Sequence, residues 1–321
     1  MTTRLLLLTA LAVGLAACDG YEDDAFTPQL VVAAQLGANE PFPDVRLTET
    51  SPFLARYDPA DLGVAGAEVT ITRDGGDVLR YVPGGAAGTY VPADPDATVA
   101  PGATYRLAVT VGERRLTAET TVPAALQIVE EPAEEVVYGV GQGPEVRVNK
   151  TGTAERQAAF VGSTRALEPA AFEEVTVDGD TLFRSVPGTG FLPTPIYARF
   201  LDCEPEPSGT LLCGEDPRAD DVVVGTSPVI NEASYVDLGD GTLLVQIPFL
   251  AFGYFGPSQV TLVSLDPALQ TFVQTQAVQL GGSTLSPGEI PNATSNVEGG
   301  LGVFGSFARV TERTRIVEPR I

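Results

Sequence analysis

Short segments in which apolar and polar residues alternate, separated by turns rich in glycine and proline, recur along most of the chain. Residues 67–73 alternate in this way, and an Asp-Gly-Gly turn at 74–76 separates them from a second run at 78–82. A period of two places successive side chains on opposite faces of a strand, so these segments are expected to be half-buried antiparallel strands. Glycine and proline supply 60 of 321 residues (34 + 26), which favours short strands over long helices.

The first domain is predicted to span residues 28–123. It holds about seven such segments with turn signals roughly every 8–12 residues, a spacing that resembles an immunoglobulin- or fibronectin-like β-sandwich. The tryptophan of true immunoglobulin domains is absent, and so are cysteines within this range. A related sandwich is therefore expected, and not a member of that family.

Residues 124–321 are predicted to form a second, larger β-rich domain with one packed helix. Pro132 and the glutamates around it mark the boundary. The expected helix covers 266–279, with Ser264 or Asp266 as its N-cap and Pro267 in its first turn. The expected strands are residues 145–149, 174–178, 196–200, 222–224, 242–247 and 259–263.

The N-terminus has the pattern of an export signal. Residues 1–17 contain one basic residue, Arg4, followed by a thirteen-residue apolar run, which is shorter than the roughly 20 residues of a membrane-spanning helix. The run ends in Leu-Ala-Ala-Cys18 and resembles the lipobox of bacterial lipoproteins. That resemblance implies cleavage before Cys18, a thioether-linked diacylglyceryl group, and acylation of the new amine. The alternative is an ordinary secretory signal that contains a cysteine.

Residues 18–27 follow as an acidic tether, with Asp19, Glu22, Asp23 and Asp24. They are either a solvated spacer or a sorting signal. Acidic residues after the lipidated cysteine resemble a surface-export signal, whereas a single Asp at that place resembles an inner-membrane retention signal. We expect an outer-membrane location, with exposure at the cell surface. The motif does not decide whether the lipid anchor lies in the inner or the outer leaflet of that membrane.

Two further cysteines, Cys203 and Cys213, flank a segment that contains two prolines and a glycine and can turn. In an oxidising compartment they are expected to form a disulfide. A metal pair would need further cysteines or a histidine, and a catalytic thiol would need a base.

The composition excludes several kinds of chemistry. The chain has no His and a single Lys, so catalytic triads, His-ligated zinc sites and imidazole proton relays cannot form. The net charge is -23, and it becomes -24 (18 bases against 42 acids) once residues 1–17 are removed. Such a surface repels nucleic acid.

Carboxylates are the one abundant catalytic group. The pairs Glu173-Glu174 and Asp220-Asp221 could in principle serve a glycosidase-type hydrolase, but solvated surface acids are expected among 42. Calcium is the ion that oxygen ligands would favour, yet residues 216–221 and 237–240 do not match an EF-hand loop. They are expected to be turns, and no cofactor is expected.

Four aromatic residues fall within seven positions: Phe249, Phe252, Tyr254 and Phe255. They are either core side chains at a corner of the chain or an exposed patch that docks a receptor or stacks on a ligand.

Gly300, Gly302 and Gly305 match GxGxxG. A dinucleotide site would require a helix after the motif, but an alternating strand at 307–316 follows. The glycines are therefore expected to allow a close approach of backbones, anchored by Val303, Phe304 and Phe307.

The lipobox, a sandwich ending near Thr120-Thr-Val-Pro123, the 260–266 strand-to-helix junction and the closing 296–305 motif together resemble a lipoprotein family known as domain of unknown function 4249. In that family the helix that corresponds to residues 266–279 is richer in Tyr, and here Phe272 is the aromatic residue in place of those tyrosines. The resemblance implies an outer-membrane lipoprotein, often encoded beside a TonB-dependent receptor, with no assigned activity.

The leading hypothesis is therefore a non-enzymatic accessory lipoprotein that binds an outer-membrane transporter or its nutrient. A structural or adhesive surface module is the alternative, and a carboxylate-based hydrolase is the third.

Overall fold

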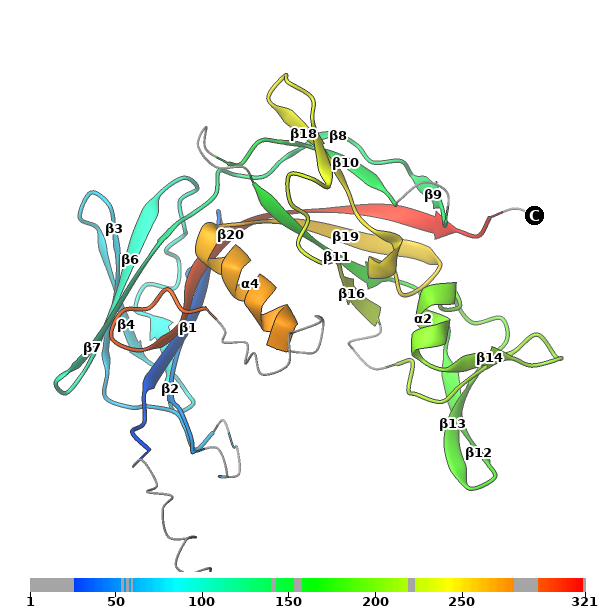
Figure 1. Ribbon diagram of the computed structural model, residues 1–321, viewed down its shortest axis with the longest axis horizontal. Helices are drawn as coiled ribbons and strands as arrows, with labels where there is room; N and C mark the ends of the chain where they lie inside the picture. Colours follow the sequence, from blue (N-terminus) through cyan, green and yellow to red (C-terminus); the bar gives the residue numbers. More distant parts are fainter. Residues whose placement is uncertain are drawn as a thin grey trace, which may run out of the picture.

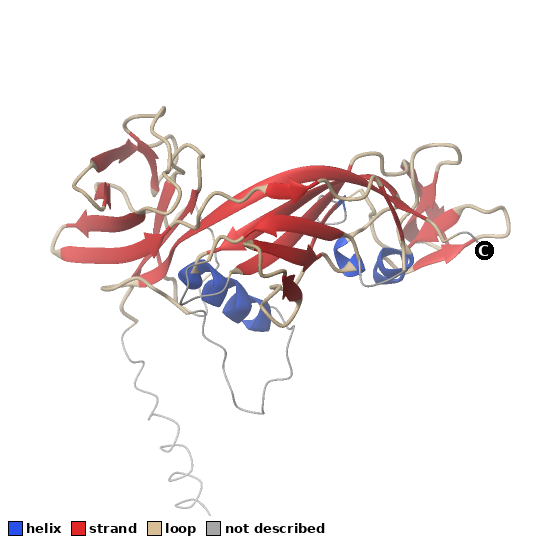
Figure 2. Cartoon of the chain, turned by 90° about the horizontal axis from the view of Figure 1, so that it is seen from above, coloured by secondary structure: helices blue, strands red, loops and turns tan. Residues whose placement is uncertain are grey.

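The computed structural model describes residues 26–319 apart from 53–54, 56–57, 59, 140–142, 153–157, 219–222 and 280–293. The described chain is mainly β, with three sheets and two α-helices (Figures 1 and 2). Cys18 and most of the predicted tether lie outside the described residues, as do Asp220 and Asp221. Among the described residues, no helix combines the length and the apolar character needed to cross a membrane.

The first unit, which we call the N-lobe, contains seven consecutive strands arranged in the order β1-β2-β5-β4-β3-β6-β7. The alternation predicted from the sequence is visible in the burial: Val69 and Ile71 of β3 point into the core, as do Leu107 and Val109 of β6. The strands are β1 (Leu30–Gly37), β2 (Val45–Glu49), β3 (Glu68–Arg73), β4 (Val78–Pro83), β5 (Thr89–Pro92), β6 (Thr104–Val111) and β7 (Arg114–Thr121).

The N-lobe is completed by the far end of the chain. The last strand, β20 (Leu301–Val317), pairs in parallel with β1 from Val31↔Leu301 to Gly37↔Phe307. Just before it, the backbone N–H of Thr117 donates to Glu298 O (3.1 Å) and that of Glu298 donates to Thr117 O (2.8 Å). Residues 297–307 therefore bridge β7 and β1, and Val297 and Phe304 contribute to the core of the lobe.

The second half of β20 belongs to the other unit, the C-lobe. Residues Phe307 to Ile316 pair antiparallel with β19, so one strand runs through both lobes (Figure 1). The predicted boundary at 123–124 falls between β7 and β8, and β20 crosses back over it. The strands of the C-lobe are β8 (Ile128–Glu130), β9 (Glu135–Val137), β10 (Glu145–Asn149), β11 (Ala159–Ala166), β16 (Val224–Thr226), β17 (Tyr235–Asp237), β18 (Thr242–Gln246) and β19 (Gly256–Leu265).

The two faces of the β19–β20 region are covered differently. One face packs against the small sheet β17-β18-β10-β8, and their shared core includes Val146, Val245, Leu262 and Ala308. Helix α4 (Pro267–Gln279) lies on the other face, where Leu269 packs with residues of β19 and β20. Side chains alternate between faces along a strand, so both layers can bury their apolar residues on the same two strands.

Helix α4 confirms the helix predicted at 266–279. Asp266 is its N-cap: the backbone N–H groups of Leu269 and Ala268 donate to its carboxylate at 3.0 and 3.2 Å. Of the two capping candidates, Asp266 is therefore the one that the structure uses.

A third sheet forms a separate projection, which we call the arm. It contains β12 (Phe172–Val177), β13 (Asp180–Ser185), β15 (Leu211–Cys213) and β14 (Cys203–Pro205), in that order, with helix α2 (Pro195–Phe200) beside β14. The predicted strand at 196–200 is wrong, because these residues form α2. Pro195 fixes the first helical φ angle, and Ala198 N–H bonds to Thr194 O at 2.8 Å.

The glycine-rich motif lies in and just before β20. A Cβ atom on Gly302, whose φ is +122°, would come within 1.8 Å of Val32 O on β1, and one on Gly300 would contact Leu30 O at 2.6 Å. Glycine allows the parallel strands to approach at these points. Val303 and Phe304 are buried and Phe307 is half-buried, as expected for the anchors. A strand and no helix follows, which agrees with rejecting a dinucleotide fingerprint.

Candidate functional site

The predicted disulfide is present between Cys203 and Cys213, which are directly paired on β14 and β15. Cys213 is fully buried in the small core of the arm. The disulfide therefore fastens the edge of the arm sheet and contributes no free thiol.

The aromatic run does not form the exposed patch that was one of its two expected roles. Phe249, Phe252 and Tyr254 are at most 9% exposed, and Phe255 is half-buried. Phe249 packs on Tyr138 with ring centroids 4.8 Å apart, and Tyr254 Oη donates to Pro217 O at 2.9 Å. The run turns a corner through a short 3-10 helix, η2 (Phe249–Ala251), and this corner directs its rings into the core.

The candidate acids that the structure describes lie on strands and in turns, and several of them form ion pairs. Glu174 on β12 pairs with Arg218 (3.0 Å), and Asp237 pairs with Lys150 (2.6 Å). The Lys150 hydrogen bond lowers the pKa of Asp237. No group of three or more His, Cys, Asp or Glu that could hold a metal ion occurs among the described residues. Of the acids considered for calcium, Asp216, Asp237 and Asp240 lie in the described part of the chain, and each makes local turn and ion-pair contacts.

The C-lobe instead presents an open groove of about 510 Å³, which we call the acidic groove. One wall is the chain from Glu130 to Val137, and the floor is the outward face of β10 and β18. Glu145 and Arg147 alternate outward on β10 because Val146 and Val148 point into the core. The apolar lining includes Pro132, Val136, Val137, Pro144 and Leu244.

The charges that line this groove are unbalanced. Glu130, Glu131, Glu135 and Glu145 contribute four carboxylates against the single guanidinium of Arg147. That guanidinium already bonds Glu130 (3.1 Å) and Asp240 (2.7 Å), and the Glu130 hydrogen bond is the largest cause of its raised pKa. Glu131 and Glu135 have no ion-pair partner among the described residues. The groove therefore keeps a net negative charge.

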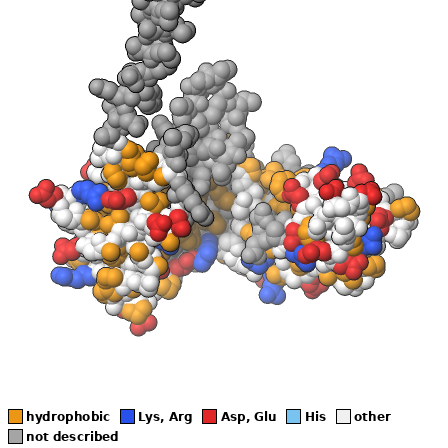
Figure 3. Space-filling model, turned by 90° about the horizontal axis from the view of Figure 1, so that it is seen from below, with side chains coloured by type: hydrophobic (Ala, Val, Ile, Leu, Met, Phe, Trp, Pro, Cys, Tyr) orange, Lys and Arg blue, Asp and Glu red, His pale blue; other side chains and the backbone are white. Residues whose placement is uncertain are grey.

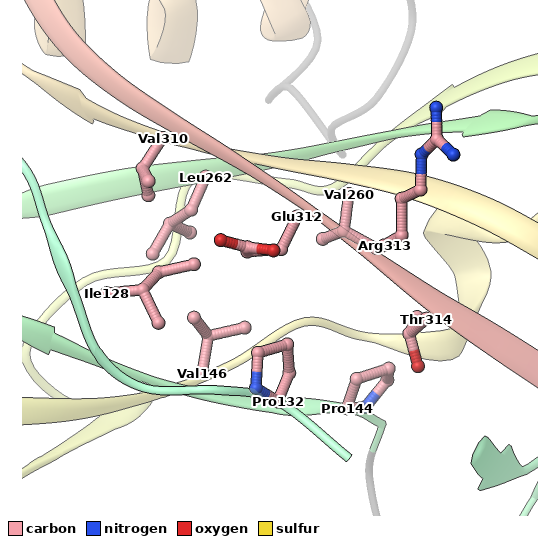
Figure 4. A pocket seen from close by; sticks show the side chains of 10 residues that line it. All are labelled: Ile128, Pro132, Pro144, Val146, Val260, Leu262, Val310, Glu312, Arg313 and Thr314. Carbon is pink, nitrogen blue, oxygen red and sulfur yellow. The ribbon is translucent and has the colours of Figure 1, made fainter. Parts of the chain in front are cut away.

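A small cavity lies behind the groove, between the two sheets of the C-lobe (Figure 4). Its volume is about 10 Å³, the space of about one water molecule. Glu312 from β20 lines this cavity together with Ile128, Leu262 and Val260, and its carboxylate makes no hydrogen bond with any residue that the structure describes. Pro132 and Pro144 line both spaces, so they separate the cavity from the groove.

A second depression, of about 610 Å³, lies on the N-lobe. Its charges are balanced: Arg106 and Arg115 face Glu119 and Glu298, and Arg106 bonds Glu119 at 2.6 Å. Acidic and basic side chains are likewise interspersed over the described surface seen from below (Figure 3). Of these two depressions, the acidic groove is the one with a charge that a ligand could complement.

One sequence feature belongs to this groove, namely the proline and the glutamates at 130–135. Sequence alone interprets them as a domain boundary. The floor of the groove comes from β10 and β18, and Leu244 and Gln246 of β18 lie about 100 positions further along the chain than β10. Their proximity depends on the pairing of β10 with β18, which no local pattern specifies.

Comparison with known proteins gives a match to a family model and weak matches to solved structures. The model of a family described as "Domain of unknown function (DUF4249)" matches residues 19–313. No curated protein matches. Two solved fragments of the titin I-band, I67–I69 and an E-to-A variant of it, each cover 92% of this chain and 100% of their own, with 11% and 13% identity and TM-scores of 0.17.

Proposed function

The chain belongs to the DUF4249 family, and from that premise we propose that it is a lipid-anchored outer-membrane lipoprotein that binds and does not catalyse. Its expected role is accessory to a TonB-dependent receptor, in the binding or uptake of a nutrient. The family carries no assigned activity, so the proposal rests on the sequence and on the geometry of this chain.

The anchor is supported by two observations. The lipobox ends at Cys18, and the family match begins at the next residue, 19. This is the arrangement expected for a mature chain that starts at a lipidated cysteine. Two or more acyl chains, at about 0.8 kcal/mol for each buried CH₂, would make such an attachment stable.

For the N-lobe we propose a sandwich related to the immunoglobulin and fibronectin type. Its support is the order of seven short antiparallel strands around one core, closed by residues 297–307. In this proposal the lobe is a spacer that stands next to the tether.

The observation that carries the proposal is the path of β20. This strand pairs with β1, the first strand after the tether, and then with β19 in the lobe that contains the acidic groove. A continuous strand connects the two lobes more firmly than a linker alone would. A binding face in the C-lobe would thus be held at a fixed position relative to the anchor.

The test is to extract the lipidated protein from native membranes in mild detergent and to identify what co-purifies. We expect a large β-barrel receptor. Recovery of the lipoprotein alone would contradict the receptor role, and binding to cells or matrix without a barrel would favour the adhesive alternative. Cys18→Ala is the control for the anchor, because the variant should leave the membrane fraction.

A further inference from the structure

We infer that the acidic groove binds an extended segment of a partner protein that presents Lys or Arg and apolar side chains on one face. This inference rests on the proposed binding function and specifies the chemistry of the partner. The groove combines an apolar lining, an uncompensated negative charge and an open, elongated wall, and each feature restricts the occupant.

Charge complementarity selects a cationic occupant. The four groove glutamates outnumber Arg147, and that guanidinium is occupied by Glu130 and Asp240. Glu131 and Glu135 are exposed and are free to pair with a partner's ammonium or guanidinium group. Complementary charge at a groove contributes specificity and association rate more than affinity.

The apolar lining favours an occupant that has apolar side chains as well as a positive charge. Val137 is 38% exposed, and Pro132, Val136 and Leu244 lie alongside it. Together they provide apolar surface between the carboxylates. Lys and Arg stems cover such surface while their charged ends reach the rim, and an intervening Val or Leu would add contact area.

The shape selects an extended chain. The wall begins at the last residue of β8 and ends with β9, so strand backbone forms both ends of the groove wall, and residues 131–134 connect them. Residues two apart in an extended segment lie on the same face. Such a segment could therefore direct a basic residue and an apolar residue into the groove together.

The probe is a fluorescein-labelled peptide of Lys-Ser-Val-Ser repeats, in which Lys and Val share one face. Its counterpart carries Glu in place of Lys. Anisotropy titrations use the full-length lipidated protein in detergent. The test variants are the double substitution Glu131→Gln/Glu135→Gln, which removes two unpaired charges, and Val137→Ser. Glu113→Gln/Glu204→Gln removes the same charge from exposed positions in the N-lobe and the arm and is the matched control.

We expect the Lys peptide to bind and the Glu peptide not to bind. The Glu131/Glu135 double variant should weaken binding about fivefold, Val137→Ser should also weaken it, and the control should stay within about twofold. Binding should decrease as salt is raised. Equal binding of the two peptides, or equal losses in test and control variants, would overturn the inference.

The receptor experiment separates this inference from the proposed function. If the Glu131/Glu135 variant remains anchored but loses the receptor, both are supported. If no receptor co-purifies with the unaltered protein while the Lys peptide still binds with the expected variant profile, the accessory role fails and the groove assignment stands.

Discussion

Thr120 Oγ1 donates a hydrogen bond of 3.0 Å to Asp266 Oδ2, across 146 residues of sequence and between the two lobes. Thr120 lies on β7 of the N-lobe, and Asp266 is the N-cap of α4. The backbone N–H of Ser306 on β20 donates to the other carboxylate oxygen at 2.9 Å. A single buried carboxylate therefore connects β7, β20 and α4 at the place where the lobes meet.

Replacing this carboxylate should destabilise the protein. Asp266→Ala removes a helix cap and leaves buried N–H and O–H donors without an acceptor, so we expect the free energy of unfolding to fall by about 2–3 kcal/mol. Asp266→Asn keeps one acceptor oxygen and should cost less. Urea unfolding measures both effects, with the exposed hairpin residue Asp180→Ala as the control. A loss no larger than that of the control would contradict the role of Asp266.

Asp266 should also make stability depend on pH. Burial raises its pKa from the ordinary value of 3.8, and the bond from Ser306 N–H is the largest opposing cause. Between 3.8 and the raised pKa the folded state binds more protons than the unfolded state, so this residue makes the free energy of unfolding decrease as the pH rises through that window. The contribution is fully present below pH 3.8 and is lost above the raised pKa.

The measurement is urea unfolding from pH 3 to pH 7 for the unaltered protein and for Asp266→Asn. The difference between the two curves isolates Asp266 from the other carboxylates. We expect the unaltered protein to lose stability relative to the variant as the pH rises. A difference that is constant over this range would show that Asp266 titrates normally.

The close approach of β20 to β1 predicts a strong effect at Gly302. A Cβ atom at Gly302 would lie 1.8 Å from Val32 O, which is much shorter than a van der Waals contact, and the φ angle of +122° disfavours any residue but glycine. We therefore expect Gly302→Ala to destabilise the N-lobe by about 3 kcal/mol or more. Gly85→Ala is the matched control, because a Cβ at Gly85 would meet nothing within 4 Å. Thermal unfolding followed by circular dichroism distinguishes the two, and similar melting temperatures would contradict the prediction.

The sequence predicts the elements that local burial determines, but not the strands with which they pair. Alternation at 67–73 and 307–316 predicted strands because local burial determines that pattern. The partners of β20 could not be predicted, because Gly302 meets Val32 and Arg309 meets Val263 only through long-range pairing. Local alternation also gave a wrong prediction at 196–200, where a strand was expected and Pro195 begins helix α2. The burial of the aromatic residues at 249–255 could not be predicted from the sequence, because the short helix η2 determines the direction in which the Phe249 and Phe252 rings point.

The disulfide predicts local and not global destabilisation. Cys203→Ser/Cys213→Ser should weaken the arm by about 2–3 kcal/mol on the loop-closure model, because β14 otherwise contacts its sheet through one short ladder. Limited proteolysis should cut residues 168–218 faster in the variant than in the unaltered protein. Binding of the Lys peptide to the groove should be unchanged. A matching loss of peptide binding would indicate that the arm and the groove are coupled.

Replacing Glu312 with an apolar residue should increase the stability of the protein. Its carboxylate faces an apolar cavity lined by Ile128, Val146 and Leu262, with no hydrogen-bond partner in the described part of the chain. Glu312 is half-buried, and an apolar side chain at this place would pack against the apolar residues that line the space between the sheets. We therefore expect Glu312→Val to raise the free energy of unfolding by about 0.5–1.5 kcal/mol. Glu134→Val, at an exposed position, is the control and should not stabilise.

The same variant tests whether the carboxylate serves binding. Pro132 and Pro144 separate Glu312 from the groove, so its charge acts on a bound cation only over a distance. If the Lys peptide binds Glu312→Val as tightly as the unaltered protein, the cavity is a packing defect behind the groove. If affinity falls about twofold or more while stability rises, the Glu312 carboxylate contributes to the negative field of the groove.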